Sequence, residues 1–316
     1  MPEIKKILVI RLSSFGDIVL SFPLLKKLKE KFPASEIHFF TKKDFSELIS
    51  MNPHVDKVIL LDDNQSLARK QINSEDYDLI IDIHKNFRSI LSSIFIGGKI
   101  YRYKKENFKK FLLVKFKINL FKEIIPVYKK YLLTIQKYLN SDDYKFVVTD
   151  LKFDKEKFIE SEYIVVSPSS KHFTKTYPAD KFIKYINSRA DIKFVLVGDK
   201  SKTDHDICKY IESKCINVLN LCSKLSIDKL ANVLYNSKHV ICNDSAILHF
   251  AESLGKKVTA IFGSTVREFG FFPQLNHSEV LEVRNLYCRP CTHIGRESCP
   301  EGHFKCMNEI QLAVNH

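Results

Sequence analysis

The chain has 316 residues, of which 45% are hydrophobic and 28% charged, and its formal net charge is +13. This length suits two domains with cores of their own, and the composition is ordinary for a globular protein. There is no run of 18 apolar residues to span a bilayer and no signal-peptide pattern at the start, so we expect a cytoplasmic protein. The basic surplus favours anionic partners, although lysines that only solvate helix faces would produce it equally well.

In the first half of the chain, short apolar runs alternate with helical patterns. The run at 6–11 ends in a turn containing serine and glycine, and Ile18, Phe22, Leu25 and Leu28 then share one helical face up to Pro33. Further strands are predicted at 36–40, 58–61 and 79–83. Strands that alternate with helices indicate parallel β-α-β units.

The stretch 102–145 is basic and aromatic and shows no clean strand pattern. We interpret it as helices near the edge of the first domain. Its mixture of Lys with Phe and Tyr suits either a contact with lipid headgroups or an ordinary amphipathic helix.

A second strand–helix series follows, with strands predicted at 163–168, 194–198, 239–242 and 258–263. Two such series predict an α/β chain of two doubly wound, Rossmann-like domains facing a cleft, with ligands at the carboxyl ends of the strands. We assign 1–155 to an N-terminal domain, 156–285 to a C-terminal domain, and 286–316 to a Cys-rich tail with a C-terminal helix.

Three turns at predicted strand ends have residues suited to binding anions. In the first, Gly16 allows close backbone approach and Asp17 stands at a helix start, where a carboxylate also offsets the helix dipole. The second, 167–178, contains hydroxyls and two lysines that phosphate oxygens can contact, although a plain polar loop has the same composition.

The third turn joins a strand to a helix at Asp244 and Ser245. Free backbone N–H groups at such a helix start can bind a diphosphate, but both residues are also ordinary N-caps. His249 lies one helical turn further along an apolar pattern, where a lone histidine is more often structural.

Taken in order, these turns make the chain resemble the family 9 glycosyltransferases, the bacterial heptosyltransferases of lipopolysaccharide core synthesis. The resemblance is carried by residues 7–19, 175–178, 243–251 and 260–265. It implies the GT-B fold, with the active site between two Rossmann-like domains and a final helix that crosses back to the first. It also implies an ADP-heptose donor bound by the C-terminal nucleotide-sugar-binding domain (156–285), an inner-core acceptor bound by the N-terminal acceptor-binding domain (1–155), and inversion in one displacement.

The resemblance also implies roles for single residues. Asp17 matches the general base, Lys175 a contact to the donor phosphates, and Asp244 with the following turn the donor-binding segment. Ala246 stands where the family usually has glycine, and alanine avoids strain only at negative φ. The expected donor-binding residues are Ser169, Ser170, Lys175, Asp244, Ser245, Ala246 and His249.

This chemistry needs no metal cofactor. A carboxylate accepts the proton of the attacking hydroxyl, while lysine, serine hydroxyls and a helix start stabilise the leaving diphosphate. Asp204-His205-Asp206 has the spacing of a metal-binding motif, but its stretch is Lys-rich and helical in pattern, so we interpret it as solvated. Ser14, Lys85 and Arg88 are predicted to bind the acceptor, although 82–88 also reads as a polar loop.

The tail contains Cys288, Cys291, Cys299 and Cys306, with histidines nearby. Structural zinc, two disulfides and free thiols remain open here, since the spacing is irregular for zinc and the compartment disfavours disulfides. The remaining four cysteines are scattered and are expected to be core thiols.

The predicted partners are a nucleotide-sugar donor, an anionic glycolipid acceptor and the inner membrane, contacted peripherally, with no nucleic acid. Alternatives are a transferase using another nucleotide sugar and acceptor, or a relative of the same fold that binds without turnover. A nucleic-acid binder is suggested only by charge and the Cys tail. A nicotinamide dehydrogenase is disfavoured because no Gly-x-Gly-x-x-Gly follows the first strand.

Overall fold

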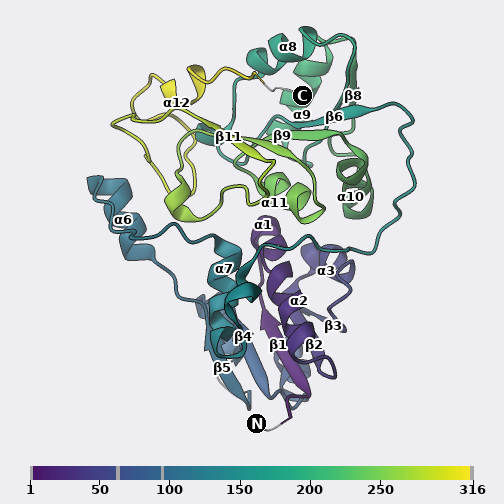
Figure 1. Ribbon diagram of the computed structural model, residues 1–316, viewed down its shortest axis with the longest axis vertical. Coiled ribbons are helices and arrows are strands. Elements are labelled where there is room, and N and C mark those ends of the chain that lie inside the picture. The colour runs from purple at the N-terminus through teal and green to yellow at the C-terminus, as the bar shows by residue number, and fades with distance from the viewer. Residues whose placement is uncertain (1–2, 62–64, 94–95, 314–316) are drawn as a thin grey trace. The chain divides into compact units, whose positions relative to one another are not determined.

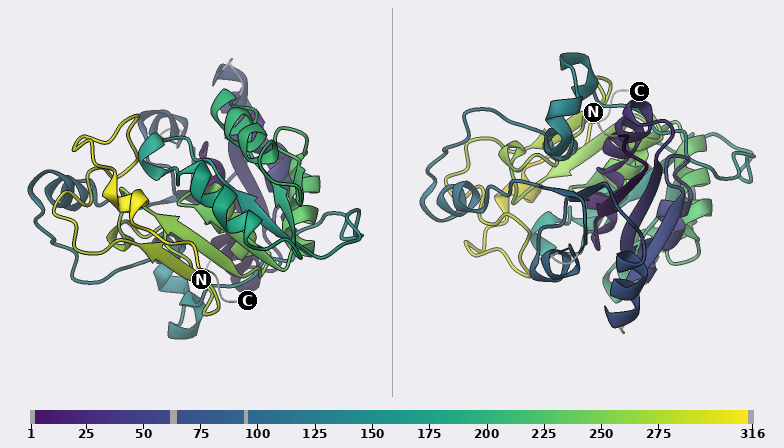
Figure 2. Two further views of the ribbon diagram at one scale, coloured as in Figure 1. Left: turned by 90° about the horizontal axis from the view of Figure 1, so that it is seen from above. Right: turned by 90° about the horizontal axis from the view of Figure 1, so that it is seen from below.

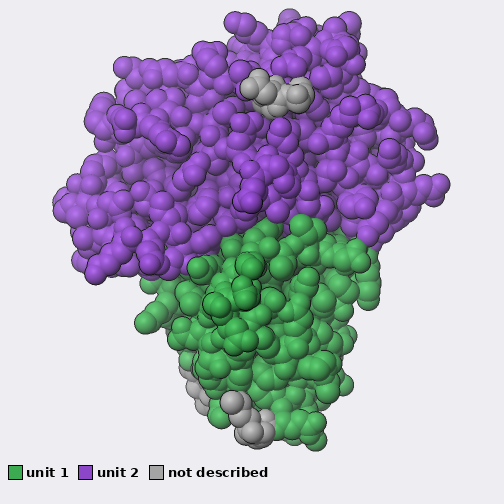
Figure 3. Space-filling model, in the orientation of Figure 1, with its two compact units in different colours: residues 1–105, 127–152 green, residues 106–126, 153–316 purple. Residues whose placement is uncertain are grey.

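The computed structural model describes residues 3–61, 65–93 and 96–313. The chain forms two compact units, which Figure 3 colours separately. Unit 1 comprises residues 1–105 and 127–152, and unit 2 comprises 106–126 and 153–316. No helix within these described ranges is long and apolar enough to cross a membrane.

Unit 1 is built on a parallel five-stranded sheet of order β3-β2-β1-β4-β5 (Figure 1). The strands are β1 (Lys6–Ile10), β2 (Glu36–Lys42), β3 (Lys57–Leu61), β4 (Leu79–Asp82) and β5 (Lys99–Arg102). In the central strand β1, Ile7 to Ile10 are fully buried, as expected for a parallel strand covered by helices on both faces. Ile10 pairs with Phe40 on one side and with Asp82 on the other, so the ends of β1, β2 and β4 meet at one edge.

The helices of unit 1 are α1 (Phe15–Val19), α2 (Phe22–Lys31), α3 (Ser46–Ser50), α4 (Gln65–Asn73), α5 (Phe87–Ser93) and α7 (Val127–Leu132), with short 3-10 turns at 43–45, 133–138 and 141–144. The single helix predicted after the first turn is two helices, α1 and α2. Pro23 lies in the first turn of α2, where its missing N–H costs no helix bond, and the break falls just before it.

Unit 2 has a parallel six-stranded sheet of order β11-β10-β9-β6-β7-β8. The strands are β6 (Tyr163–Ser167), β7 (Lys193–Leu196), β8 (Val218–Asn220), β9 (His239–Asn243), β10 (Val258–Phe262) and β11 (Glu279–Glu282). β8 and β11, like β5 in unit 1, were not predicted from the sequence. All three are edge strands of three or four residues without a continuous buried run, so they lack the pattern that marks a central strand.

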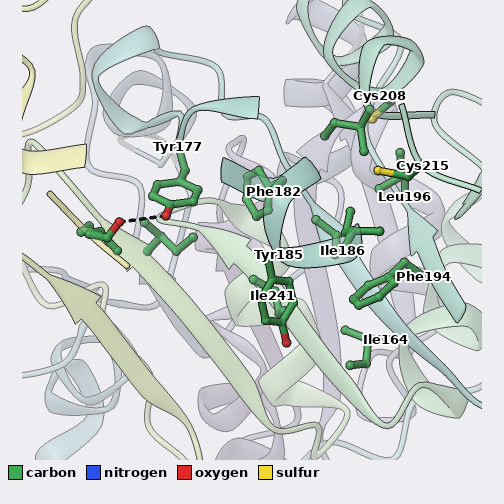
Figure 4. Packing of buried hydrophobic residues seen from close by; sticks show 14 of the residues in the cluster. Ile164, Tyr177, Phe182, Tyr185, Ile186, Phe194, Leu196, Cys208, Cys215 and Ile241 are labelled. Atoms are coloured by element: carbon green, nitrogen blue, oxygen red, sulfur yellow. Dashed lines mark hydrogen bonds between the residues drawn. The ribbon is translucent and has the colours of Figure 1, made fainter. Parts of the chain in front are cut away.

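The helices of unit 2 are α6 (Asn107–Phe116), α8 (Ala179–Asn187), α9 (Lys202–Glu212), α10 (Ile227–Asn236), α11 (Ala246–Ser253) and α12 (Lys305–Asn308), with 3-10 turns at 173–175 and 267–269. Within this unit α8 and α9 cover one face of the sheet and α10 and α11 the other (Figures 1 and 2). Phe182 and Ile186 of α8 pack on Phe194 of β7 in the core (Figure 4). Asp204 lies in the first turn of α9, where its amide binds the capping Ser201 hydroxyl.

Two segments are placed differently from the expected division of the chain. Residues 106–126, assigned from sequence to the N-terminal domain, make their contacts within unit 2. The C-terminal residues also stay with unit 2, because Phe304, Met307 and Ile310 enter its core and the Tyr177 hydroxyl donates to the Ile310 carbonyl at 2.9 Å (Figure 4). The final helix, α12, has four residues and does not cross to the first unit.

Candidate functional site

In unit 1 the chain passes from β1 into α1 through a short turn that presents Asp17. Ser14 is the N-cap of α1 and forms a capping box with Asp17, whose Oδ2 accepts a hydrogen bond from the Ser14 hydroxyl at 2.8 Å. The carboxylate is thus held at the carboxyl end of the central strand, where parallel sheets bind ligands.

Asp17 is mostly buried and strongly paired. Arg11 Nη2 lies 2.6 Å from its Oδ2, and the Tyr131 hydroxyl donates to its Oδ1 at 3.2 Å. Burial by itself would raise the pKa of the carboxyl, but the Arg11 charge and the hydrogen bonds from Ser14 and Tyr131 outweigh it, so the pKa of Asp17 is lowered below its usual value. Asp17 is therefore ionised at neutral pH, as a general base must be.

Arg11 is itself fixed by its surroundings. Its Nη1 donates to the Ile83 carbonyl at 2.8 Å, and its guanidinium lies 5.8 Å from the centre of the Tyr131 ring. Sequence analysis did not single out Arg11 or Tyr131 as site residues. The position of Arg11 directly after a buried strand could have marked it as a site residue. Tyr131 is 114 residues from Asp17, so no local sequence pattern links the two.

The loop after β4 is organised by a buried carboxylate. Asp82 Oδ1 accepts from the backbone amides of His84 and Lys85 at 3.0 and 2.7 Å, and its Oδ2 accepts from the Ser89 hydroxyl at 2.9 Å. These bonds hold the loop beside the first turn, and Lys85 takes a left-handed backbone with φ of 47°.

A cavity of about 290 Å³ opens between this loop and the turn after β1. Its lining residues are Leu12, Ser13, Lys42, His84, Asn86, Phe87 and Arg88. Burial and the nearby charges of Arg11 and Lys105 lower the pKa of His84 to about 4, so its ring is neutral at physiological pH. Its buried Nδ1 has no hydrogen-bond partner among the described residues.

The three residues predicted to bind the acceptor take different places. Arg88 lines the cavity, Ser14 is engaged with Asp17, and Lys85 belongs to the same loop without lining the cavity. His84 and Lys42, which also line it, were not named as site residues in the sequence analysis.

In unit 2, three serines stand at equivalent positions after neighbouring strands. Ser169 follows β6, Ser245 follows β9 and Ser264 follows β10, each two residues beyond the strand end, and the sheet order places these strands side by side. The Oγ of each serine is buried and without a hydrogen-bond partner in the part of the chain that the structure describes. Buried hydroxyls are rarely left unpaired, so three at one sheet edge suit the binding of a polar ligand or of ordered water.

A charged pair lies at the same edge. Lys175 Nζ is 2.7 Å from Asp244 Oδ2, which also accepts a hydrogen bond from the Thr265 hydroxyl at 2.6 Å. Asn243, at the end of β9, joins two loops, because its Nδ2 donates to the Pro168 carbonyl and its Oδ1 accepts from the Tyr177 amide. Asn243, Ser264 and Thr265 were not named among the expected donor-binding residues, although all three lie within the segments that carry the resemblance.

The helix α11 begins at this edge, with Ser245 as its N-cap and Ala246 as its first residue. Ala246 is not among the residues with positive φ, so alanine fits here without strain. His249 is buried one turn into the helix and its ring lies 5.9 Å from that of Phe271. Ser170 is buried in the loop after β6, and its carbonyl accepts from the Thr176 hydroxyl. The predicted donor-binding residues thus come together in unit 2.

All eight cysteines lie in the described residues and all carry free thiols. Cys208, Cys215, Cys222 and Cys242 are buried in unit 2, as expected for core thiols. In the tail, Cys288 Sγ lies 3.9 Å from His303 Nε2. Over the described residues, no three His, Cys, Asp or Glu side chains are placed to hold a metal ion.

Comparisons with known proteins agree with this arrangement. The model of glycosyltransferase family 9 (heptosyltransferase) matches residues 66–301. Lipopolysaccharide heptosyltransferase 1 of Campylobacter coli is 25% identical over 290 residues, which cover 82% of this chain and 84% of that protein.

Two solved structures from Escherichia coli have the same fold. ADP-heptose lipopolysaccharide heptosyltransferase II gives a TM-score of 0.72 at 18% identity, covering 96% of this chain and 98% of that one. Heptosyltransferase WaaC, solved with ADP, gives a TM-score of 0.70 at 16% identity, covering 87% of this chain and 92% of that one. These likenesses confirm the predicted α/β, GT-B fold.

Proposed function

Because the chain belongs to glycosyltransferase family 9 and is a glycosyltransferase of the lipopolysaccharide heptosyltransferase kind, we propose that it transfers heptose from ADP-heptose to the lipopolysaccharide inner core with inversion. Of the solved relatives described above, one is solved with ADP and the other is named for ADP-heptose, which supports this donor.

The three unpaired strand-end serines carry the donor half of the proposal. A nucleoside diphosphate has several oxygens that accept hydrogen bonds. The three buried serine hydroxyls can donate to such oxygens, because they have no other partner among the described residues. Lys175 and the start of α11 add positive charge at the same edge. Together they stabilise the negative charge that builds on the departing diphosphate, which lowers the barrier to transfer.

Asp17 carries the acceptor half. As an ionised carboxylate it accepts the proton of the attacking hydroxyl as the new glycosidic bond forms and the bond to the diphosphate breaks. We assign the acceptor to the neighbouring cavity, where Arg88 and Lys42 suit an anionic sugar and the neutral His84 supplies a further hydrogen-bonding group.

A donor screen tests the proposal. Purified protein is incubated with ADP-heptose, a UDP-sugar or a GDP-sugar, each with a heptose-deficient core lipid, and nucleoside diphosphate release is measured. We expect release of ADP only when ADP-heptose and the lipid are both present, and loss of release in the Asp17→Asn variant. Release from a UDP-sugar instead would refute the donor, and binding of donors without any release would identify a non-catalytic relative.

We also propose that transfer requires no metal, since Lys175 and backbone amides supply the positive charge that a metal would otherwise bring. Treatment with EDTA followed by desalting should leave the transfer rate unchanged, whereas Lys175→Met should lower it by about two orders of magnitude. A rate that falls with EDTA and returns with a divalent cation would overturn this part of the proposal.

Since the acceptor carries lipid, we propose that the protein works at the cytoplasmic face of the inner membrane, through peripheral contact.

A further inference from the structure

Residues 107–124, which we call the α6 segment, expose an unusual number of large apolar side chains. It consists of α6 and the irregular chain that follows. Six of its apolar residues are 45–69% exposed: Phe108, Phe111, Phe116, Ile118, Leu120 and Ile124. Single exposed apolar residues are normal, but six within 17 positions are an unusual concentration, and clustered exposed apolar residues often mark an interaction surface.

One side of the segment is anchored to the rest of unit 2. Lys117 Nζ donates to the carbonyls of Cys288 and Pro290 at 3.0 and 2.6 Å, and Asn119 Nδ2 donates to Glu268 Oε1 at 3.0 Å. Leu113 is buried, and the Lys110 ammonium lies over the Phe269 ring. These contacts hold the segment as a defined surface element rather than a loose loop.

The exposed apolar residues of the segment are interspersed with positive charge. The Lys115 ammonium lies over the rings of Phe111 and Phe116, 5.6 and 5.4 Å from their centres, and Lys122 is exposed. The segment contains five lysines and a single acidic residue, Glu123. Figure 1 shows α6 at the periphery of the ribbon, away from the sheet of unit 2.

We propose that the α6 segment is the surface by which the protein docks on an anionic lipid bilayer. Aromatic and aliphatic side chains interleaved with lysine fit the boundary between headgroups and acyl chains, because the rings enter the acyl region while the ammonium groups meet the phosphates. A protein partner would bury the apolar residues equally well, but the lysines among them favour a negatively charged surface. The inference extends the proposed membrane contact by locating it, and it requires neither donor nor acceptor.

Vesicle flotation tests the docking surface without any substrate. Wild type should bind vesicles of phosphatidylethanolamine and phosphatidylglycerol but not vesicles of phosphatidylcholine alone. The triple change Phe108→Ser, Phe111→Ser and Phe116→Ser should lower the partition coefficient by about tenfold or more. A matched control changes two exposed apolar residues elsewhere in unit 2, Ile216→Ser and Phe158→Ser, and should bind like wild type.

The charge contribution is tested by Lys115→Glu with Lys122→Glu, against Lys200→Glu with Lys214→Glu, which changes the net charge equally at exposed positions elsewhere in unit 2. We expect only the first pair to lose binding, by about tenfold. Equal losses from both pairs would mean that net charge alone binds the vesicles, and would overturn the proposal.

The absence of tryptophan from the sequence allows a direct reading of insertion. Phe111→Trp should shift its emission to shorter wavelength when the anionic vesicles are added, and Ile216→Trp should not. The docking surface would be refuted if the emission of Phe111→Trp did not shift, or if the triple serine variant bound vesicles as well as wild type. If the serine variant instead converts a dimer to a monomer while vesicle binding persists, the segment is a contact between copies and the proposal fails. Any of these results leaves the donor screen, and so the proposed reaction, untouched.

Discussion

The properties of Asp17 depend on two residues that hold it. In a buried site an isolated carboxylate tends to be protonated, since burial disfavours the charge. Arg11, at 2.6 Å, and the Tyr131 hydroxyl reverse that tendency and keep the carboxylate ionised. The same ion pair lowers the proton affinity of Asp17, so in the proposed reaction the carboxylate is charged but is a weaker base.

Removing Arg11 should therefore move the pH dependence of catalysis. In Arg11→Gln the lowering influence is gone while burial remains, so the pKa of Asp17 rises and the acidic limb of kcat shifts to higher pH. A pH–rate profile between pH 4.5 and 8, a range chosen about the ordinary carboxyl and histidine pKa values, measures the shift. Arg11→Lys should move the acidic limb only part of the way from its wild-type position, because the positive charge is kept. Arg88→Gln, in the nearby cavity, should alter KM without moving the limb. An unmoved limb in Arg11→Gln would show that Asp17 is not the titrating base.

At the scale of secondary-structure elements, the proposed donor site depends on a repeated arrangement of strand and serine. Three parallel strands, β6, β9 and β10, each end two residues before a serine, and adjacent pairing of the strands brings the three hydroxyls to one edge. Loops at the carboxyl ends of such a sheet converge because the strands are parallel and in register. Asn243 and Asp244 then tie the loops together and leave the serine hydroxyls unpaired.

Substitution of a strand-end serine should affect ADP binding without lowering the stability of the fold. A buried, unpaired hydroxyl costs free energy in the ligand-free protein, so Ser264→Ala should leave the free energy of unfolding unchanged or slightly higher. It should weaken ADP binding by about threefold to tenfold, as expected for one lost hydrogen bond. Ser237 is a matched control, because its hydroxyl already donates to the Leu234 carbonyl at 2.7 Å.

Calorimetry with ADP and thermal unfolding distinguish the two variants. Ser237→Ala should lower the melting temperature and leave ADP affinity unchanged. Ser264→Ala should weaken ADP binding and leave the melting temperature unchanged or slightly higher. Equal ADP affinity in wild type and in both Ser264→Ala and Ser169→Ala would show that no diphosphate binds at this edge.

At the scale of the whole molecule, segments far apart in sequence complete unit 2. The C-terminal residues fill its core, and Met307 packs so closely on Gly263 that a Cβ at that glycine would lie 2.6 Å from the methionine Cε. Residues 106–126 join the same unit although the chain on both sides of them belongs to unit 1. The unit that holds the predicted donor-binding residues therefore depends on contacts between segments far apart in the chain.

Met307→Ala tests the contribution of the tail. Met307 is fully buried, so truncation should lower the free energy of unfolding by about 2–5 kcal/mol through lost burial and a cavity. Asn308→Ala, at an exposed neighbouring position, should cost much less. Denaturant unfolding measures both, and a Met307→Ala variant as stable as wild type would mean that the tail does not complete the core.

The amino-acid sequence by itself determined the two parallel sheets, because central strands buried on both faces are largely apolar and are visible as runs such as 7–10 and 194–196. It also placed Asp17, Lys175 and Asp244 at strand ends. Only the tertiary structure decided that Arg11 and Tyr131 hold Asp17 ionised, that three serine hydroxyls are left unpaired, and that the α6 segment belongs to unit 2. A pKa or an unpaired hydroxyl depends on distances between residues remote in sequence, and no local pattern of residues contains those distances.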